Sequence, residues 1–413
     1  MRNAAVVAYH SSPLLEPGVG DAGGMTVYLR EVARALAKRH IRTDVFTRSS
    51  SGSIETTDIF PGVRVVAIPA GPVGDLSKSE LPAYIGDFAA GIRAFAMASR
   101  IGYDIVHSHY WQSGIAGAEL ASTWRVPMVH SNHTLAKVKN RFLPPGDNPE
   151  PVVRLDGEAT VIAAADTLIA STDDEWEHLA CLYGAPHDRI KTIYPGVDHG
   201  LFEPGDRRAA RAQLGFGDEA ILTFVGRIQP LKGLSLAVRA VEQLVPVLDR
   251  DIKLVVVGGA SGPSGASERA RLIGLARKLG ISEALHFAGP QPHERTPLFY
   301  RAADAVVVCS YSESFGLSAL EAQACGIPIV GTDVGGLRHI VRDGDSGYLV
   351  GSRDPSDFAA RLKTLLADDH LRTAFSRTAT ESAASFTWER TGTELADLYE
   401  CLVTERLPEV CTC

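Results

Sequence analysis

Residues 305–330 read Ala305-Val-Val-Val-Cys-Ser-Tyr-Ser-Glu-Ser-Phe-Gly-Leu-Ser-Ala-Leu-Glu-Ala-Gln-Ala-Cys-Gly-Ile-Pro-Ile-Val330, which predicts a strand, a loop, a helix and a second strand. The apolar run 305–309 is typical of a parallel strand that is buried on both faces. Residues 317–325 have helical composition, and Gly326 and Pro328 follow in the order that ends a helix. This order favours an α/β fold built on a doubly wound parallel sheet.

The loop in this stretch has the chemistry of a binding site. Residues 314–317 would place free backbone N–H groups at a helix N-terminus, where anions bind well. Glu313 and Glu321 flank that point, and two carboxylates cannot themselves bind an anion. They suit hydroxyl groups, such as those of a sugar and a ribose joined to a bound diphosphate. Taken alone, the stretch also fits an ordinary strand–helix corner with glutamates at the surface.

Length and composition predict a two-domain enzyme of the cytoplasm. A chain of 413 residues is too long for one ordinary core. The net charge of −8 excludes a general attraction to nucleic acid or to anionic membranes. We find no apolar run of membrane-spanning length and no signal peptide. Most of the six cysteines lie in apolar runs and indicate reduced thiols, whereas Cys411 and Cys413 are interpreted as part of a frayed end.

The first half of the chain begins with a strand over 4–9 and a glycine-rich turn. Gly23 and Gly24 lie where this turn becomes a helix, and glycine there lets backbone N–H groups approach a ligand. Further strands are expected over 43–47 and 63–69. A helix is expected from 76 to about 100, with Lys78 in its first turn. A cation gains nothing from the helix dipole there, so Lys78 is equally well interpreted as a solvated lysine.

Residues 104–114 are expected to form a strand that runs into a polar, aromatic loop, and residues 126–132 repeat this plan before His133. In doubly wound sheets, ligands collect beyond the carboxyl ends of the strands. The pair His107 and His109 has a spacing that two metal ligands can share, but no matching carboxylate or cysteine cluster is visible, and we predict no metal. The residues expected at these strand ends are His107, His109, Tyr110, His133 and Thr134.

The second half of the chain begins after a hinge expected at 193–198. A buried strand from Ala220 delivers Arg227 and Lys232 into one loop. Arginine can bind phosphate oxygens in bidentate fashion, and lysine adds a point charge. The glycines of loop 258–265 lack the dinucleotide-binding spacing, so no nicotinamide or flavin cofactor is expected.

Together these motifs resemble the retaining glycosyltransferases of family 4, and the resemblance covers essentially the whole chain. The matching segments are Gly20-Asp-Ala-Gly-Gly-Met25, His107-Ser-His-Tyr-Trp111, His133-Thr-Leu-Ala-Lys-Val-Lys-Asn140, Gly226-Arg-Ile-Gln-Pro-Leu-Lys232 and 310–326. The resemblance implies the GT-B fold, in which two Rossmann-like domains face a central cleft. It implies an acceptor domain over 1–196, a nucleotide-sugar domain over 197–383, and a C-terminal helix within 384–413 that crosses back to the first domain.

The resemblance also implies roles for individual residues. Arg227 and Lys232 would hold the diphosphate, Glu321 the ribose, Glu313 the transferred sugar, and His133 the sugar or its phosphate. We therefore expect His133, Arg227, Lys232 and Glu313 to be catalytic. The expected donor-binding residues are Gly23, Gly24, Arg227, Lys232, Glu313, Ser314, Phe315, Gly316, Leu317 and Glu321.

On the acceptor side, Lys78, Tyr110, Thr134 and Arg154 match the family positions that bind the acceptor's phosphate. Thr26 departs from the family, which has asparagine at the position that reaches the acceptor's hydroxyls. A second departure is Ser131-Asn132, which replaces the usual Thr-Ala pair before the site histidine. Because a hydroxyl is shorter than an amide and has fewer donors, the identity of the acceptor stays open.

The expected activity is metal-independent transfer of a sugar with retention, from UDP-N-acetylglucosamine or a similar donor to a small anionic acceptor such as inositol 1-phosphate. The alternative is a GDP-sugar-dependent transfer to the thiol of ergothioneine in lincosamide biosynthesis. Two other hypotheses are a sugar-nucleotide epimerase and a catalytically silent nucleotide-sugar-binding protein. No prosthetic group, nucleic acid or membrane partner is expected. Relatives in this family are often dimers, so a homodimer is a further expectation.

Overall fold

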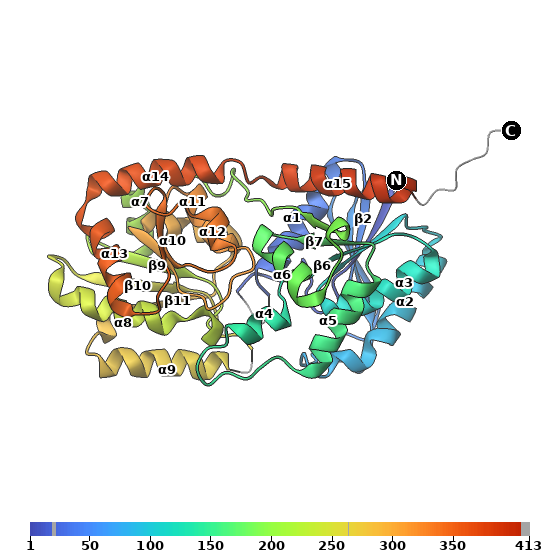
Figure 1. The fold of residues 1–413 in the computed structure, drawn as a ribbon, viewed down its shortest axis with the longest axis horizontal. Helices are drawn as coiled ribbons and strands as arrows, with labels where there is room; N and C mark the ends of the chain where they lie inside the picture. The colour runs from blue at the N-terminus through green and yellow to red at the C-terminus, as the bar shows by residue number, and fades with distance from the viewer. Residues whose placement is uncertain (19–21, 263, 406–413) are drawn as a thin grey trace.

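The structure is a computed structural model, and it describes residues 1–18, 22–262 and 264–405. Figure 1 shows two α/β lobes side by side, each with helices on both faces of a central sheet. The prediction of two doubly wound, mainly parallel sheets is confirmed. Gly20 and Asp21 of the glycine-rich turn, and Cys411 and Cys413 of the tail, lie outside the described residues.

The first lobe is built on an eight-stranded sheet in the order β3-β4-β2-β1-β5-β6-β7-β8. Its strands are parallel except β3, which runs antiparallel to β4. Apolar strands such as β1 are buried on both faces, as the continuous apolar runs predict. The strands are β1 (Asn3–Val7), β2 (Arg42–Ser49), β3 (Glu55–Phe60), β4 (Val63–Pro69), β5 (Ile105–His109), β6 (Met128–Ser131), β7 (Thr167–Ala170) and β8 (Ile190–Thr192). The helices are α1 (Gly24–Lys38), α2 (Ile85–Ser99), α3 (Trp111–Trp124), α4 (Ala136–Arg141), α5 (Val152–Ala164) and α6 (Asp173–Tyr183).

The second lobe is built on a six-stranded parallel sheet in the order β11-β10-β9-β12-β13-β14. Its strands are β9 (Ala220–Val225), β10 (Ile252–Val257), β11 (Leu285–Gly289), β12 (Ala305–Val308), β13 (Ile329–Thr332) and β14 (Gly347–Val350). Its helices are α7 (Arg207–Leu214), α8 (Leu234–Leu244), α9 (Gly265–Lys278), α10 (Thr296–Ala302), α11 (Leu317–Ala324), α12 (Leu337–Ile340), α13 (Pro355–Ala367) and α14 (Asp369–Ala383). Short 3-10 helices include η1 (Leu81–Tyr84), η3 (Pro230–Lys232) and η6 (His293–Arg295).

The last helix, α15 (Trp388–Glu405), lies on the first lobe although it follows the second in sequence. In Figure 1, α14 runs along the second lobe and α15 continues along the first. Trp388, Leu395 and Tyr399 are buried in one cluster with Tyr28 and Leu36 of α1. The apolar face of α15 therefore joins the two ends of the chain. The residue boundaries of the domains stay a prediction.

Two local predictions differ from the structure. The edge strand β3 was not expected, because its exposed residues are polar and it is ordered by pairing with β4. The helix expected from residue 76 begins at Leu81, so Lys78 lies in a turn before the helix. The reason is that Glu80 Oε2 accepts hydrogen bonds from the backbone N–H (2.9 Å) and the hydroxyl (2.6 Å) of Ser77, which closes a separate turn.

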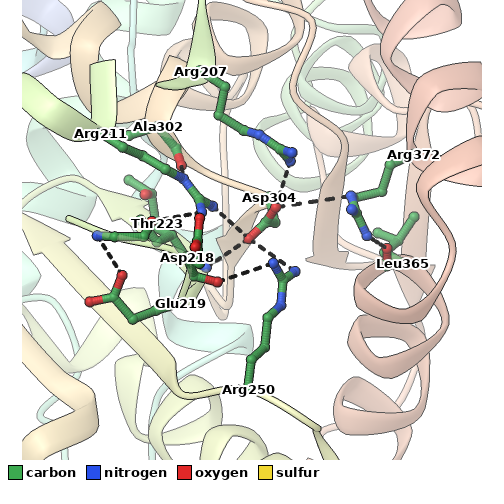
Figure 2. Close-up of polar contacts among 12 residues, drawn as sticks. Arg207, Arg211, Asp218, Glu219, Thr223, Arg250, Ala302, Asp304, Leu365 and Arg372 are labelled. Atoms are coloured by element: carbon green, nitrogen blue, oxygen red, sulfur yellow. Dashed lines mark hydrogen bonds and ion pairs between the residues drawn. The ribbon is translucent and has the colours of Figure 1, made fainter. Parts of the chain in front are cut away.

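One buried carboxylate joins several elements of the second lobe. Figure 2 shows Asp304, which precedes β12, surrounded by arginines from separate parts of the lobe. Asp304 is 2% exposed and accepts hydrogen bonds from Arg207 Nη1 (2.8 Å), Arg211 Nη2 (2.9 Å) and the backbone N–H of Ile221 (2.8 Å). Arg372 Nε of α14 lies 4.0 Å away. Asp304 therefore connects α7, β9, β12 and α14. The loops that follow β9 and β12 belong to the site described next.

Candidate active site between the two lobes

A cavity of about 500 Å³ lies between the lobes, where the carboxyl ends of strands from both sheets meet. Every predicted site residue except Thr26 lines this cavity. The first lobe contributes Gly23, Gly24, Lys78, Tyr110, His133, Thr134 and Arg154, and the second contributes Arg227, Lys232, Glu313, Ser314, Phe315, Gly316, Leu317 and Glu321.

Two helices begin at this cavity after glycine N-caps, which have no side chain to cap them. Helix α1 starts at Gly24 after Gly23, and α11 starts at Leu317 after Gly316. The third backbone N–H of each helix donates to the carbonyl of its N-cap glycine (Thr26 to Gly23 and Ala319 to Gly316, both 2.9 Å), whereas the N–H groups of the first helical residues lie at the cavity, where both dipoles favour negative charge. A Cβ atom at residue 23 would come 3.3 Å from Arg227 Nε, so glycine lets α1 approach the arginine of the opposite lobe.

Lys232 and Glu313 form an ion pair inside the cavity. Lys232 Nζ lies 2.6 Å from Glu313 Oε2, which also accepts a hydrogen bond from Ser310 Oγ (3.0 Å). The loop that carries Glu313 is held from behind, because Gly336 N–H donates to the Glu313 carbonyl (3.0 Å). The Glu313 carboxylate therefore fixes the position of the Lys232 ammonium group before a phosphate binds there.

Glu321, in α11, is held by two side chains of its own lobe. His293 Nε2 lies 2.9 Å from Glu321 Oε1, and the hydroxyl of Tyr300 donates to Oε2 (2.9 Å). Tyr300 is buried, and burial followed by the charge of Glu321 raises its pKa well above the usual value, so it stays a hydrogen-bond donor. Glu321 therefore presents an oriented carboxylate to the cavity.

The opposite end of the cavity is formed by the first lobe. Arg154 is 4% exposed, and its guanidinium lies 5.0 Å from the centre of the Tyr110 ring. It donates from Nη2 to the carbonyl (3.1 Å) and the hydroxyl (2.9 Å) of Thr134. Glu158 Oε1 (2.8 Å) and Glu150 Oε2 (2.9 Å) balance its charge. Arg154 thus positions Thr134 and Tyr110 as well as lining the cavity.

The lobes also touch directly around the cavity. Thr172 Oγ1 donates to the carbonyl of Ser314 (3.4 Å). Asp174 Oδ2 lies 3.4 Å from His339 Nε2 of the second lobe. The side chain of Leu317 packs into a cluster made mainly of first-lobe residues. The structure is therefore that of a closed cleft.

The chain matches two family models that cover its two lobes. Residues 22–201 match the model described as Glycosyltransferase Family 4, and residues 206–382 match that of the glycosyl transferases group 1. D-inositol 3-phosphate glycosyltransferase 2 of Catenulispora acidiphila is 47% identical, over 99% of this chain and 98% of the relative. The chain belongs to glycosyltransferase family 4. A second D-inositol 3-phosphate glycosyltransferase, from Acidothermus cellulolyticus, is also 47% identical, over 98% of this chain and 91% of the relative.

Solved structures place this glycosyltransferase in the GT-B fold. Sucrose-phosphate synthase of Thermosynechococcus elongatus superposes with a TM-score of 0.90 at 30% identity, covering 98% of this chain and 100% of that one. Anabaena HepE in complex with UDP and glucose superposes with a TM-score of 0.77 at 19% identity, covering 97% and 99% of the two chains. The expected fold is confirmed.

Thr26 is the predicted site residue that the structure does not bring to the cavity of the glycosyltransferase. It lies on the inner face of α1, is 0% exposed, and its hydroxyl contacts Ser11 Oγ at 3.2 Å. Ser11 lines the cavity instead. The expected direct contact between Thr26 and an acceptor stays a prediction, and in this structure Ser11 lies between the Thr26 hydroxyl and the cavity.

The cavity residues that the sequence analysis missed include His293, Glu175 and Ser11. His293 lies in a loop after β11, and a single histidine in a loop carries no motif. Glu175 was outside the predicted site because an acidic first turn is an ordinary helix start. It is 5% exposed, and burial raises its pKa. Ser11 has no sequence signal, since only the fold brings it beside α1.

Histidines gather beneath the first-lobe side of the cavity. His109 Nδ1 lies 2.9 Å from His133 Nε2, and His107 Nε2 lies 2.9 Å from Ser131 Oγ. Burial lowers the pKa of His133 to about 4 and that of His130 to about 3, and it holds the pKa of His107 and His109 well below the usual value. These rings are therefore neutral at pH 7. His133 reaches the cavity with φ of 60°, a backbone conformation that is uncommon outside glycine.

Acid is expected to destabilise the protein through these rings. An unfolded histidine binds a proton below pH 6.5, whereas native His133 stays neutral down to about pH 4, so stability falls as the pH drops through that window. His133 alone should lower the free energy of unfolding by about 2 kcal/mol when the pH drops from 7 to 5. Urea unfolding of the wild type and of His133→Asn at both pH values measures it. Asparagine tolerates the positive φ.

The His133→Asn variant should lose less stability on acidification than the wild type. His286→Asn is the matched control, because His286 is exposed on β11. If the free energy of unfolding falls equally in the wild type and in His133→Asn on acidification, the assignment of a neutral His133 is contradicted.

Within residues 1–18, 22–262 and 264–405, no group of three or more His, Cys, Asp or Glu side chains is arranged to hold a metal ion. In the same part of the chain, no helix is both long and apolar enough to cross a bilayer.

Proposed function

We propose that this glycosyltransferase transfers a sugar, with retention of anomeric configuration, from a nucleoside-diphosphate sugar to a small anionic acceptor. The observation that carries the proposal is that each lobe brings basic side chains to its own end of the cavity. Arg227, Lys232 and the starts of α1 and α11 form one end, and Lys78 and Arg154 belong to the other. A donor diphosphate suits the first end, and an acceptor phosphate or carboxylate suits the second.

In this proposal the second lobe holds the donor. Arg227, Lys232 and the backbone N–H groups of Phe315–Leu317 bind the diphosphate. Glu321 accepts hydrogen bonds from ribose hydroxyls, and Glu313 does so from the transferred sugar. The ion pair with Lys232 keeps the Glu313 carboxylate next to the diphosphate, where the sugar is attached.

The first lobe holds the acceptor and closes the site. Lys78, Tyr110, Thr134 and Arg154 bind its anionic group. His133 reaches the sugar or its phosphate between the two substrates. The acceptor we favour is an inositol phosphate, because the Catenulispora relative is a D-inositol 3-phosphate glycosyltransferase. The donor we favour is UDP-N-acetylglucosamine.

The transfer requires no nucleophilic side chain and no metal ion. The bond between the anomeric carbon and the phosphate oxygen breaks while the acceptor oxygen bonds to the same face of that carbon. The proton of the acceptor hydroxyl passes to the departing phosphate oxygen. Arg227, Lys232 and the dipole of α11 stabilise the charge that develops on this leaving group. Closure of the two lobes excludes water from the reacting centre.

A second candidate is a GDP-sugar-dependent transfer to a thiol such as that of ergothioneine. It is favoured by the two departures from the family pattern next to the acceptor end. Thr26 lies behind Ser11, and Ser131 lines the cavity beside His133. A carboxylate could then occupy the place of the acceptor phosphate.

The test is a mass-spectrometric transfer assay. UDP-N-acetylglucosamine, UDP-glucose and GDP-sugars are each paired with inositol 1-phosphate, with inositol 3-phosphate and with ergothioneine. We expect product from UDP-N-acetylglucosamine and an inositol phosphate. Product only with ergothioneine would establish the second candidate, and binding without transfer to any acceptor would indicate a silent nucleotide-sugar-binding protein.

A further inference from the structure

One histidine joins the Glu321 carboxylate to the opposite lobe. On one side of its ring, His293 Nε2 lies 2.9 Å from Glu321 Oε1. On the other side, His293 Nδ1 lies 3.3 Å from Arg30 Nη2. Arg30 belongs to α1 of the first lobe, whereas His293 in η6 and Glu321 in α11 belong to the second. A continuous chain of hydrogen bonds therefore crosses the cleft.

The direction of each hydrogen bond follows from the arginine. A guanidinium only donates, so His293 Nδ1 must accept from Arg30. A neutral imidazole with a bare Nδ1 carries its proton on Nε2, which therefore donates to Glu321. The chain runs from Arg30 through a neutral His293 to Glu321, and it has this form only while the lobes are together.

The packing around the ring leaves little freedom. The side chains of His293 and Glu321 are each 10% exposed, and that of Arg30 is 20% exposed. The His293 ring centre lies 5.1 Å from that of Phe202. The hydroxyl of Thr296 donates to the His293 carbonyl. The ring is thus held between the two lobes.

We propose that His293 is a positioning residue for the donor: it holds Glu321 and, while its ring is neutral, links that carboxylate to Arg30 when the lobes close, and protonation of the ring breaks the link to Arg30. The inference rests on the proposed function, in which Glu321 binds the ribose of a nucleoside diphosphate. It adds His293, which contacts Glu321 within the second lobe and Arg30 of the first lobe.

The charged groups around His293 set the sign of the pH dependence. Burial lowers its pKa, but the hydrogen bond and the charge of Glu321 outweigh this, with help from Glu294, and the pKa is raised above 6.5 although Arg30 opposes it. Glu31 of α1 lies next to Arg30, with 3.6 Å between Oε1 and Nε, and burial raises the pKa of its carboxyl.

Above the pKa of His293, the ring is neutral and accepts from Arg30. Below it, an Nδ1–H group faces the guanidinium and the bond across the cleft is lost. The affinity for a nucleoside diphosphate should therefore fall as the pH drops through the pKa of His293.

The test is the dissociation constant of UDP, measured by calorimetry from pH 8.5 to pH 6 in the wild type and in His293→Gln. The glutamine amide can offer an oxygen to Arg30 and an N–H to Glu321, and it does not titrate. We expect the wild type to lose about tenfold in affinity across this range and His293→Gln to lose much less. Titration of UDP itself affects both proteins equally. His286→Gln, on the exposed face of β11, is the matched control and should behave as the wild type.

Arg30→Met provides a second variant that leaves the second lobe unchanged. It should bind UDP at pH 8.5 as weakly as the wild type does at pH 6, with little pH dependence of its own. Equal pH dependence in the wild type, His293→Gln and Arg30→Met would overturn the inference. Failure of the wild type to bind either UDP or GDP at any pH would overturn the proposed function, and the inference with it.

Discussion

Replacing Arg227 or Lys232 with alanine should lower kcat at least about a hundredfold, the usual cost of removing one group that stabilises charge in a transition state. Both side chains line the end of the cavity where α1 and α11 begin after glycine N-caps. In the proposed reaction, negative charge builds up there on the departing diphosphate. Steady-state kinetics at saturating donor measures the loss in kcat separately from any change in donor KM.

The matched control for both variants is Lys363→Ala. Lys363→Ala removes an exposed cation from α13, away from the cavity, and should leave kcat unchanged. Lys232→Ala also leaves Glu313 without its ion pair, so the Arg227→Ala variant, which does not disturb that pair, provides the cleaner result. Values of kcat close to the wild type in both variants would show that the diphosphate leaves from somewhere else.

Replacing Asp304 with alanine should lower the stability of the second lobe by about 3–5 kcal/mol, because the change leaves buried positive charge without a partner. Arg211, whose side chain is 8% exposed, would lose its only carboxylate within the described residues. The backbone N–H of Ile221 would lose its side-chain acceptor as well. Thermal and urea unfolding of the full chain measure the effect.

The matched control for Asp304→Ala is Asp369→Ala. Asp369 also pairs with an arginine of the cluster in Figure 2, Arg372, but its side chain is 83% exposed. An ion pair with one exposed side chain contributes ~0–1 kcal/mol to stability, so the free energy of unfolding of this variant should be close to that of the wild type. Equal and small effects of both substitutions would contradict the role given to Asp304.

The sequence predicted the fold, and it predicted which residues of the second lobe line the cavity, because the signals there are local. The apolar run at 305–309, the loop after it and the helix from Leu317 follow one another along the chain, and each has its own pattern. Arg227 and Lys232 could be placed for the same reason, since a buried strand leads directly into their loop. Contiguous residues give a periodicity that can be read without knowing the rest of the fold.

Two of the misses depend on contacts between residues that are far apart in the sequence. Thr26 occupies a family position for acceptor binding, but packing of α1 on the sheet turns its side chain inward to Ser11. His293 acquires its partners only when Arg30 of the other lobe comes beside it. No local pattern contains the information for these two residues. Lys78 is a different case: Ser77 and Glu80 are only three residues apart, and the Ser-x-x-Glu spacing at 77–80 is a local signal that the sequence analysis did not use.

The most direct test of the account is a crystal structure of the protein with a bound nucleoside-diphosphate sugar. We predict that the diphosphate contacts Arg227, Lys232 and the backbone N–H groups at the start of α11, with the ribose hydroxyls on Glu321 and the sugar on Glu313. The sugar should then point across the cavity toward His133 and the acceptor end formed by Lys78 and Arg154. A diphosphate bound at Lys78 and Arg154 instead, or a sugar facing away from the first lobe, would contradict the proposed function.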